Sequence, residues 1–275
     1  MATDLAWVSL DGDMGAVGSY LPAQLPVAGD ILRITSGNYV APSSNMDTLK
    51  AVKLALLYTG SGFRPDIGAT GSPIEVSAAK VIHRGSGTLY FKDGDDGTDE
   101  IIIDSPNTLL AAALDGAAIT MISAIRGAVQ GIGTLGAVAM LRVSHNAKVA
   151  WNAGAGAIAK AICSGGVVTC SAVVTALLQA GGNWTQAIEE IVTWDGGGGT
   201  LVYNSPTATG TMTNAYHTAR ATLILTGTTD IKTITNYYGE PGANLLRDED
   251  LHKITNEYDL TLWLRDHGTA AIPSS

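Results

Sequence analysis

Charged and aromatic residues are scarce in this chain of 275 residues. Only 15% of the residues are Asp, Glu, Lys or Arg, and only 6% are Phe, Trp or Tyr, yet 46% are hydrophobic. So apolar a chain is not disordered, and one with so few charges is not a coiled coil. Many of the side chains are small, and 33 residues are glycine. This composition predicts a fold with many tight turns and a narrow core.

Cysteine and positive charge are also in short supply. Cys163 and Cys170 are the only two cysteines. A disulfide-stapled scaffold needs many more, so we expect two free, buried thiols. The formal net charge is −9, which argues against a nucleic acid or an anionic membrane as the partner.

No targeting or membrane-spanning segment is expected. Residues 1–5 lack a basic stretch followed by an apolar run, so they do not predict a signal peptide. The most hydrophobic stretch, residues 109–143, is interrupted by Asp115, Arg126 and Arg142. A transmembrane helix needs about 20 consecutive apolar residues, and the interval between the two arginines is shorter than that. This stretch is therefore not a membrane span.

Short strands are expected before residue 119. Turn-forming residues punctuate the first 45 positions, and residues 31–34 then alternate as a strand. Residues 49–58 fit either a buried strand or one helix. Residues 74–83, 88–92 and 101–103 are predicted strands.

A degenerate repeat begins at residue 119. Residues 158–168 (IAKAICSGGVV) match residues 174–184 (VTALLQAGGNW) position by position. In this frame seven copies start at Ile119, Val138, Ile158, Val174, Ile188, Met212 and Ile231. The first and fourth positions are apolar in every copy. The ninth positions are Gly127, Asn146, Gly166, Gly182, Gly196, Arg220 and Gly239. Six of these seven tolerate a positive φ, which indicates a recurring corner.

The repeat length predicts a β-solenoid. Successive starts are on average about 19 residues apart, which is too short for pairs of helices and close to one solenoid coil. The step from Val174 to Ile188 is unusually short, and the step from Ile188 to Met212 is unusually long. Positions one and four of a straight strand face opposite sides, so burying both requires a corner between them. The alternative is an α/β fold with helices at 108–114 and 173–179, which the many glycine and β-branched residues disfavour.

These repeats resemble the β-helical structural proteins of tailed-phage virions. The resemblance rests on the Ile-x-x-Leu-x-x-x-Gly-Gly pattern, on residues 231–236 followed by 253–256, on residues 26–34 (PVAGDILRI), and on residues 103–107 (IDSPN). It covers most of residues 20–262. It implies an all-β, right-handed parallel β-helix. We expect an N-terminal cap or attachment region (1–45), a solenoid (46–242), and a charged C-terminal cap and tail (243–275).

Catalytic and nucleotide-binding motifs are weak. Residues 131–136 spell G-x-G-x-x-G, but no Asp or Glu occurs between 116 and 188, whereas a dinucleotide site needs an acid about 20 residues downstream. Polysaccharide-cleaving β-helices use clustered carboxylates. Glu189 and Glu190 are adjacent, so in a strand they point to opposite faces. We therefore expect no catalytic residues and no cofactor.

One acidic loop could hold a metal ion. Asp93, Asp95, Asp96 and Asp99 lie close together in the sequence, and carboxylate-rich loops suit Ca²⁺. A solvated turn is the competing interpretation. The five histidines are too scattered for zinc. His217 shares the sixth repeat position with Gln179, Thr193 and Asn236, which predicts a polar ladder.

The ends of the chain are the expected assembly surfaces. An open solenoid end exposes strand edges that must be covered or used in a contact. We expect Trp7 and Tyr20, or Arg247 and Arg265, to contact a partner. The resemblance implies a non-enzymatic capsid decoration protein, made in the host cytoplasm, that binds the major capsid protein and forms a homotrimer. The alternatives are a tail, fibre or baseplate protein and a carbohydrate-active tailspike enzyme.

Overall fold

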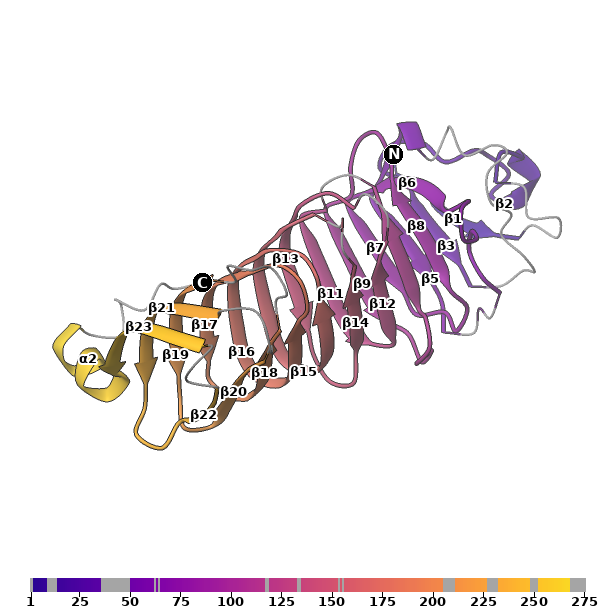
Figure 1. Ribbon diagram of the computed structural model, residues 1–275. Helices are drawn as coiled ribbons and strands as arrows, with labels where there is room; N and C mark the ends of the chain where they lie inside the picture. Colours follow the sequence, from indigo (N-terminus) through magenta and orange to yellow (C-terminus); the bar gives the residue numbers. More distant parts are fainter. Residues whose placement is uncertain are drawn as a thin grey trace.

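The computed structural model describes most of the chain. It covers residues 2–8, 14–35, 50–61, 63, 65–116, 119–132, 135–152, 154, 156–204, 211–226, 232–247 and 252–267, and the side chains of the last three are not included. Figure 1 shows a rod with β1 and β2 at one end and the helix α2 at the other.

Parallel strands stacked along the rod form a β-solenoid. In what we call the first stack, the neighbours in order are β1 (Asp4–Trp7), β3 (Ile31–Ile34), β5 (Leu56–Thr59), β7 (Lys80–His83), β9 (Glu100–Asp104), β11 (Met121–Arg126), β13 (Val138–Val143), the first halves of β15 (Ile158–Cys170) and β16 (Val174–Gln186), β17 (Ile191–Gly196), β19 (Thr211–His217), β21 (Lys232–Gly239) and β23 (His252–Asp259).

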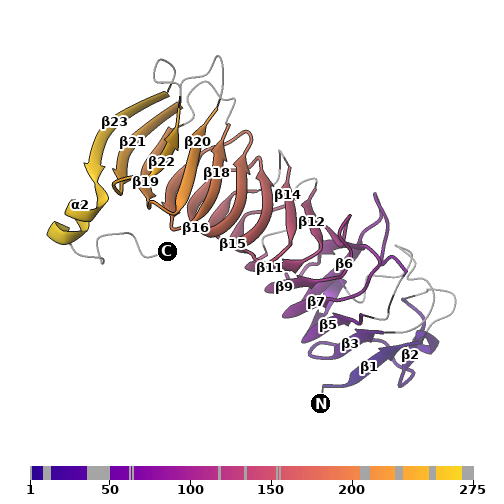
Figure 2. The same cartoon turned by 90° about the horizontal axis from the view of Figure 1, so that it is seen from below.

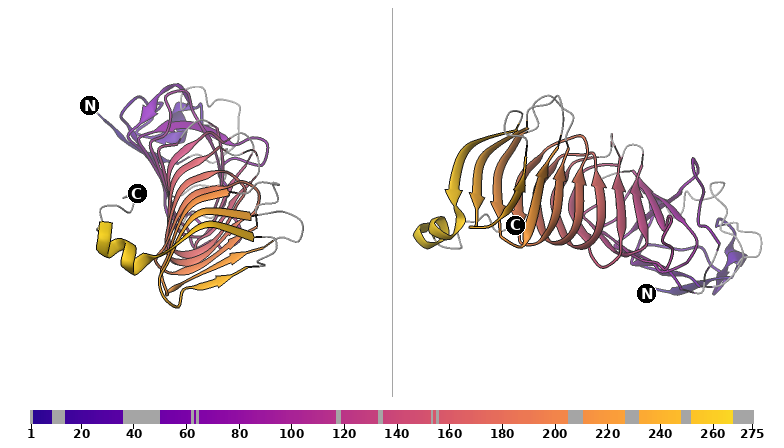
Figure 3. Two further views of the ribbon diagram at one scale, coloured as in Figure 1. Left: turned by 60° about the vertical axis from the view of Figure 1, so that its left-hand side comes forward. Right: turned by 60° about the horizontal axis from the view of Figure 1, so that its bottom comes forward.

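The other half of each coil belongs to a second stack. Its neighbours in order are β4 (Lys53–Leu54), β6 (Ile74–Ala78), β8 (Leu89–Asp93), β10 (Ala112–Asp115), β12 (Ala128–Gly131), β14 (Lys148–Trp151), the second halves of β15 and β16, β18 (Gly199–Tyr203), β20 (Ala221–Leu225) and β22 (Asn244–Leu246). Figure 3 shows the coils from near the rod axis and from the side.

Three further elements lie at the ends. The short β2 (Tyr20–Leu21) follows the 3₁₀ turn η1 (Val17–Ser19) and pairs antiparallel with β1, on the edge that β3 leaves open. The helix α2 (Leu260–His267) continues directly from β23. Figure 2 shows α2 beside the strands of the first stack.

The predicted parallel β-solenoid is confirmed, and the α/β alternative is wrong. Residues 112–115 and 174–186, which overlap the two alternative helices, are strands. Residues 31–34, 74–78, 80–83 and 101–103 are strands as expected. The strand ladder also runs through the expected boundaries at residues 45 and 242, because β1 and β3 pair with each other and β22 and β23 extend the two stacks.

The repeat frame is right in five copies and wrong in two. Strand register aligns Val174 with Ile191 rather than with Ile188, and Met212 with Ile234 rather than with Ile231. The observed starts are therefore Ile119, Val138, Ile158, Val174, Ile191, Met212 and Ile234. All seven side chains are buried. With Ile191 as the fifth start, the unusually short step before it and the unusually long step after it both disappear.

The glycine corner follows the corrected frame. Ninth positions with positive φ are Gly127, Gly166, Gly182, Gly199 and Gly242, with φ between 74° and 89°. In the second copy the left-handed residue is His145, one position earlier, with φ of 52°. The prediction that Gly196 and Gly239 form corners is wrong, because neither has a positive φ. They occupy inward positions, where an added Cβ would lie 2.2 Å from the Trp194 ring and 2.6 Å from the Tyr237 ring.

Candidate functional site

The expected metal loop joins β8 to β9. Burial raises the pKa of Asp93, which is 6% exposed. Asp95 lies 3.7 Å from Lys50, and Asp99 lies 2.7 Å from Lys53. The backbone N–H of Asp96 donates to Ser77.

The carboxylates of Asp95 and Asp99 are therefore paired with two different lysines rather than with one shared ion. Among the described residues, no three His, Cys, Asp or Glu side chains come together as metal ligands would. The calcium site at Asp93, Asp95, Asp96 and Asp99 stays a prediction, and the geometry does not favour it.

Buried polar side chains close the corners of the coils. Gln179 donates through Nε2 to the carbonyl oxygens of Gly182 (3.2 Å) and Thr200 (2.8 Å), and its Oε1 accepts from Trp194 Nε1 (3.1 Å). These bonds join the end of a first-stack strand to the beginning of a second-stack strand. They satisfy polar groups that would be costly to bury alone.

His217 forms the same kind of hydrogen bonds at a corner two coils further along the rod. Its Nε2 lies 3.0 Å from the carbonyl oxygen of Ala221, and its Nδ1 lies 2.8 Å from the Tyr237 hydroxyl. A carbonyl can only accept, so Nε2 carries the proton, and Nδ1 accepts from the tyrosine. Burial lowers the pKa of His217. The ring is therefore a neutral structural group.

His83 repeats this arrangement in an early coil. Its Nε2 lies 3.0 Å from Gly87 O, and its Nδ1 lies 2.8 Å from the Thr59 hydroxyl. Burial lowers the pKa of His83 to about 4.

Strand register places His83, Gln179 and His217 in one inward column. Gln179 and His217 share this column as predicted, but Gly196 lies between them, so they do not form a continuous ladder. Thr193 and Asn236 lie in an outward column, because the predicted frame of their two copies is wrong.

Two ladders decorate the outside of the last coils. Asn236 Nδ2 donates to Asn214 (3.0 Å), and Asn256 Nδ2 donates to Asn236 (2.9 Å). Beside them, the rings of Tyr216, Tyr238 and Tyr258 stack with centroids 4.8 and 4.9 Å apart.

The helix α2 covers part of the tyrosine stack. The Trp263 ring lies 5.8 Å from Tyr216 and 4.8 Å from Tyr238. The chain therefore uses its own helix to cover the aromatic surface of the first stack. Neither ladder is predicted from the sequence, although both come from one repeated motif. The motif Asn-x-Tyr occurs at the same position of three successive coils.

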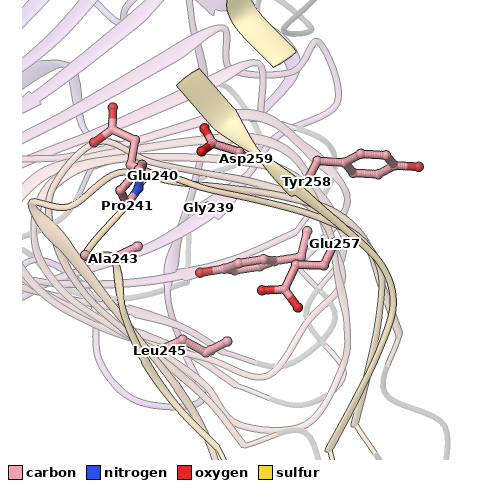
Figure 4. A pocket seen from close by; sticks show the side chains of 10 residues that line it. Gly239, Glu240, Pro241, Ala243, Leu245, Glu257, Tyr258 and Asp259 are labelled. Atoms are coloured by element: carbon pink, nitrogen blue, oxygen red, sulfur yellow. The ribbon is translucent and has the colours of Figure 1, made fainter. Parts of the chain in front are cut away.

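The C-terminal end opens into an acidic mouth. A cavity of about 450 Å³ is lined by residues that include Tyr237, Leu245, Glu240, Glu257 and Asp259. Figure 4 shows Glu257 beside Leu245, and Glu240 and Asp259 on the opposite side. Glu257 occupies the column that is apolar in the preceding coils. Inward-pointing charge at a last strand discourages the addition of further strands.

Arg247 is not among the residues that line the mouth, although its charge acts on Tyr237, which does line it. Arg247 follows β22 and is half-buried. Arg265 lies in α2, and its side chain is outside the described set. Contacts of these two residues with a partner stay predictions.

At the N-terminal end, the two expected contact residues are core residues. Trp7 and Tyr20 are 0% and 1% exposed, and their rings pack edge to face with centroids 5.6 Å apart. The Tyr20 hydroxyl donates to Met14 O (2.6 Å). Direct contact of these rings with a partner has no support in the structure, because alternation along β1 and β2 turns both inward.

The outer surface of the same segment combines exposed apolar side chains with an ion pair. Asp4 and Arg33 lie 2.9 Å apart on the face that carries Ala6. Leu21 pairs with Ala6, and Val8 lies two residues beyond Ala6, so Val8 and Leu21 share the face opposite Trp7. They are 41% and 64% exposed. Val17 and Val27, in the same segment, are 52% and 53% exposed.

Comparisons with known proteins found no match to any family model, any curated protein or any solved structure. Of the helices in the described ranges, none is long and apolar enough to cross a membrane. The glycine motif of residues 131–136 begins at the last residue of β12, and the next element of the described chain is the strand β13 rather than a helix.

Proposed function

We propose that this chain is a non-enzymatic structural protein of a tailed-phage virion. Its most specific form is a decoration protein that binds the major capsid protein on the outer surface of the shell. The chain would be made in the host cytoplasm and would act on the virion. The proposal joins the sequence resemblance to three features of the structure.

The first support is mechanical. A continuous parallel ladder from β1 to β23 makes a stiff rod whose length is set by the number of coils. A stiff rod can bridge neighbouring capsid subunits, and each contact after the first is intramolecular and therefore strengthens attachment.

The second support concerns the polar groups inside the rod. His83, Gln179 and His217 could each act in acid–base or polar chemistry, but all three are committed to corner hydrogen bonds. Their polar atoms form hydrogen bonds within the solenoid and are not directed at a substrate.

The observation that carries the attachment is the exposure of apolar side chains on the outer surface at the N-terminal end, beside the ion pair of Asp4 and Arg33. Leu21 is 64% exposed and Val8 is 41% exposed on a segment whose inward side is fully packed. We assign the capsid contact to this surface, through residues neighbouring Trp7 and Tyr20 rather than through those two rings.

Binding to capsids tests the proposal. Purified protein is mixed with undecorated heads of a tailed phage that encodes the chain, and the heads are pelleted and imaged. High-copy binding is expected for the wild type and for Leu262→Ser, a control at the opposite end where Leu262 is 50% exposed. Leu21→Ser should reduce binding at least about tenfold, because it removes an exposed apolar contact without touching the core.

Three results would overturn the proposal. The heads bind no protein, the label is found on the tail, or incubation with capsular polysaccharide releases reducing or unsaturated ends. The second result would identify a tail, fibre or baseplate protein, and the third a carbohydrate-active enzyme.

A further inference from the structure

The outer surface of the second stack is almost free of charge. Strand register aligns two outward columns over seven consecutive coils, from β12 to β22. One column is Ala128, Lys148, Val167, Asn183, Thr200, Thr222 and Asn244, and the other is Gln130, Ala150, Thr169, Thr185, Val202, Ile224 and Leu246. Lys148 is the single charged residue among them. We call these fourteen residues the neutral face.

The outer surface of the first stack is different over the same coils. Its outward columns include Arg142, Lys160 and Asp195. The part of its aromatic surface formed by Tyr216 and Tyr238 is covered by α2, which contacts β21 and β23. Figure 2 shows α2 on the side of β19, β21 and β23, away from β18 and β20. Within the described ranges, the neutral face has no such cover from the chain itself.

Apolar side chains on the neutral face are accessible. Val167 and Leu246 are 46% and 50% exposed. Beside the first coils of the face, a groove of about 550 Å³ is lined by residues that include Leu110, Ala150 and Val167. On the rim of this groove Leu109 is 89% exposed. A projecting leucine and an apolar groove therefore lie next to each other on one surface.

We infer that a second copy of this chain covers the neutral face. The net charge of −9 makes two copies repel each other overall. The neutral face contains no carboxylate, so two copies can approach along it without like-charge repulsion. The groove on one copy offers an apolar site for the projecting Leu109 of another copy, and contacts between identical subunits use such pairs of surface features.

The size of the neutral face suits a reversible contact. Seven coils spaced about 4.8 Å apart and strands of about four residues give a surface of roughly 29 by 13 Å. Two such surfaces with their flanking loops bury on the order of 1,000 Å², the lower limit for specific protein contacts. Association at micromolar concentrations is therefore expected, as a pair or a closed ring. This inference does not depend on the virion role.

Sedimentation equilibrium of the purified full chain from about 1 to 200 µM tests the inference. The wild type should exceed the monomer mass of 28.3 kDa as its concentration rises. Thr185→Glu places a carboxylate on the neutral face and should weaken association at least about tenfold. Thr193→Glu is the matched control, because Thr193 is a half-buried, outward threonine in the adjoining first-stack coil.

A second variant guards against misfolding. Leu109→Ser changes a side chain that is 89% exposed, so it leaves the fold intact and should also weaken association. A wild type that stays monomeric at the highest concentration overturns the inference, whatever its binding to capsids. Association that Thr185→Glu and Leu109→Ser leave unchanged overturns it as well.

Discussion

The corner at Gly199 offers a sharp test of what limits side-chain size in this solenoid. Gly199 has a φ of +81° and lies directly above the corner of the preceding coil. A Cβ at this position would be 2.4 Å from the carbonyl oxygen of Gly182 and 2.7 Å from the carbonyl carbon of Gly181. Those atoms are backbone, so they can move only if the ladder between the coils is distorted.

The expected cost of Gly199→Ala has two parts. An L-residue in the left-handed region loses about 1–2 kcal/mol relative to glycine. Relief of an overlap of about 1 Å with backbone adds a similar amount, as in overpacked cores. The free energy of unfolding should therefore fall by about 2–4 kcal/mol, which corresponds to roughly 5–10 °C in the thermal midpoint of a domain this large.

The matched control is Gly197→Ala, two residues earlier in the same corner. A Cβ there has its nearest neighbour, Gln179 O, at 3.6 Å, which is an ordinary contact. This variant should lie within about 0.5 kcal/mol of the wild type.

Urea unfolding followed by circular dichroism, with reversibility checked by dilution, measures both changes. Equal midpoints for the two variants would refute the reasoning that stacked backbone at the corner excludes a Cβ.

Two further predictions concern buried ionisable groups. The pKa of His83 is about 4 in the folded chain and near 6.5 when unfolded, so the unfolded state takes up a proton first as the pH falls. His83 therefore stabilises the fold above pH 6.5, and up to about 3 kcal/mol is lost between pH 6.5 and 4. His83→Gln should flatten urea stability over that range, while His145→Asn, at an exposed site, should not; identical slopes in all three proteins would contradict this. Burial raises the pKa of Cys163 to about 11 and of Cys170 to about 12, so a thiol reagent at pH 8 should label neither before urea unfolds the chain. Rapid labelling of the native protein would disprove their inert burial.

Much of the fold follows from local chemistry. Apolar residues at the first and fourth positions and glycine at the ninth specify the inward side of a strand and its corner, and these are properties of single coils. The structure confirms them at Ile158, Ala161 and Gly166, which are two buried side chains and one left-handed glycine. The repeat pattern fails at Gly196 and Gly239, because a glycine can also be required where a neighbouring aromatic ring occupies the place of its side chain. Only the packing of Trp194 and Tyr237 separates the two uses.

The candidate sites depended more on tertiary structure. Trp7 and Tyr20 are aromatic residues near an end, and sequence alone does not show that the pairing of β1 with β2 turns both rings inward. The loop from Asp93 to Asp99 is acidic in sequence, but its lysine partners come from residues 50 and 53, two coils earlier.

The sequence by itself determined that this chain coils as a parallel β-solenoid, because burial and corner formation are decided within a single coil. Only the tertiary structure decided which outward side chains line up, since the coils differ in length and their register is set by contacts between them. That alignment is the physical reason why the tyrosine and asparagine ladders, the acidic mouth and the neutral face exist as surfaces. Each is assembled from residues that are distant in sequence and adjacent only when the coils are stacked.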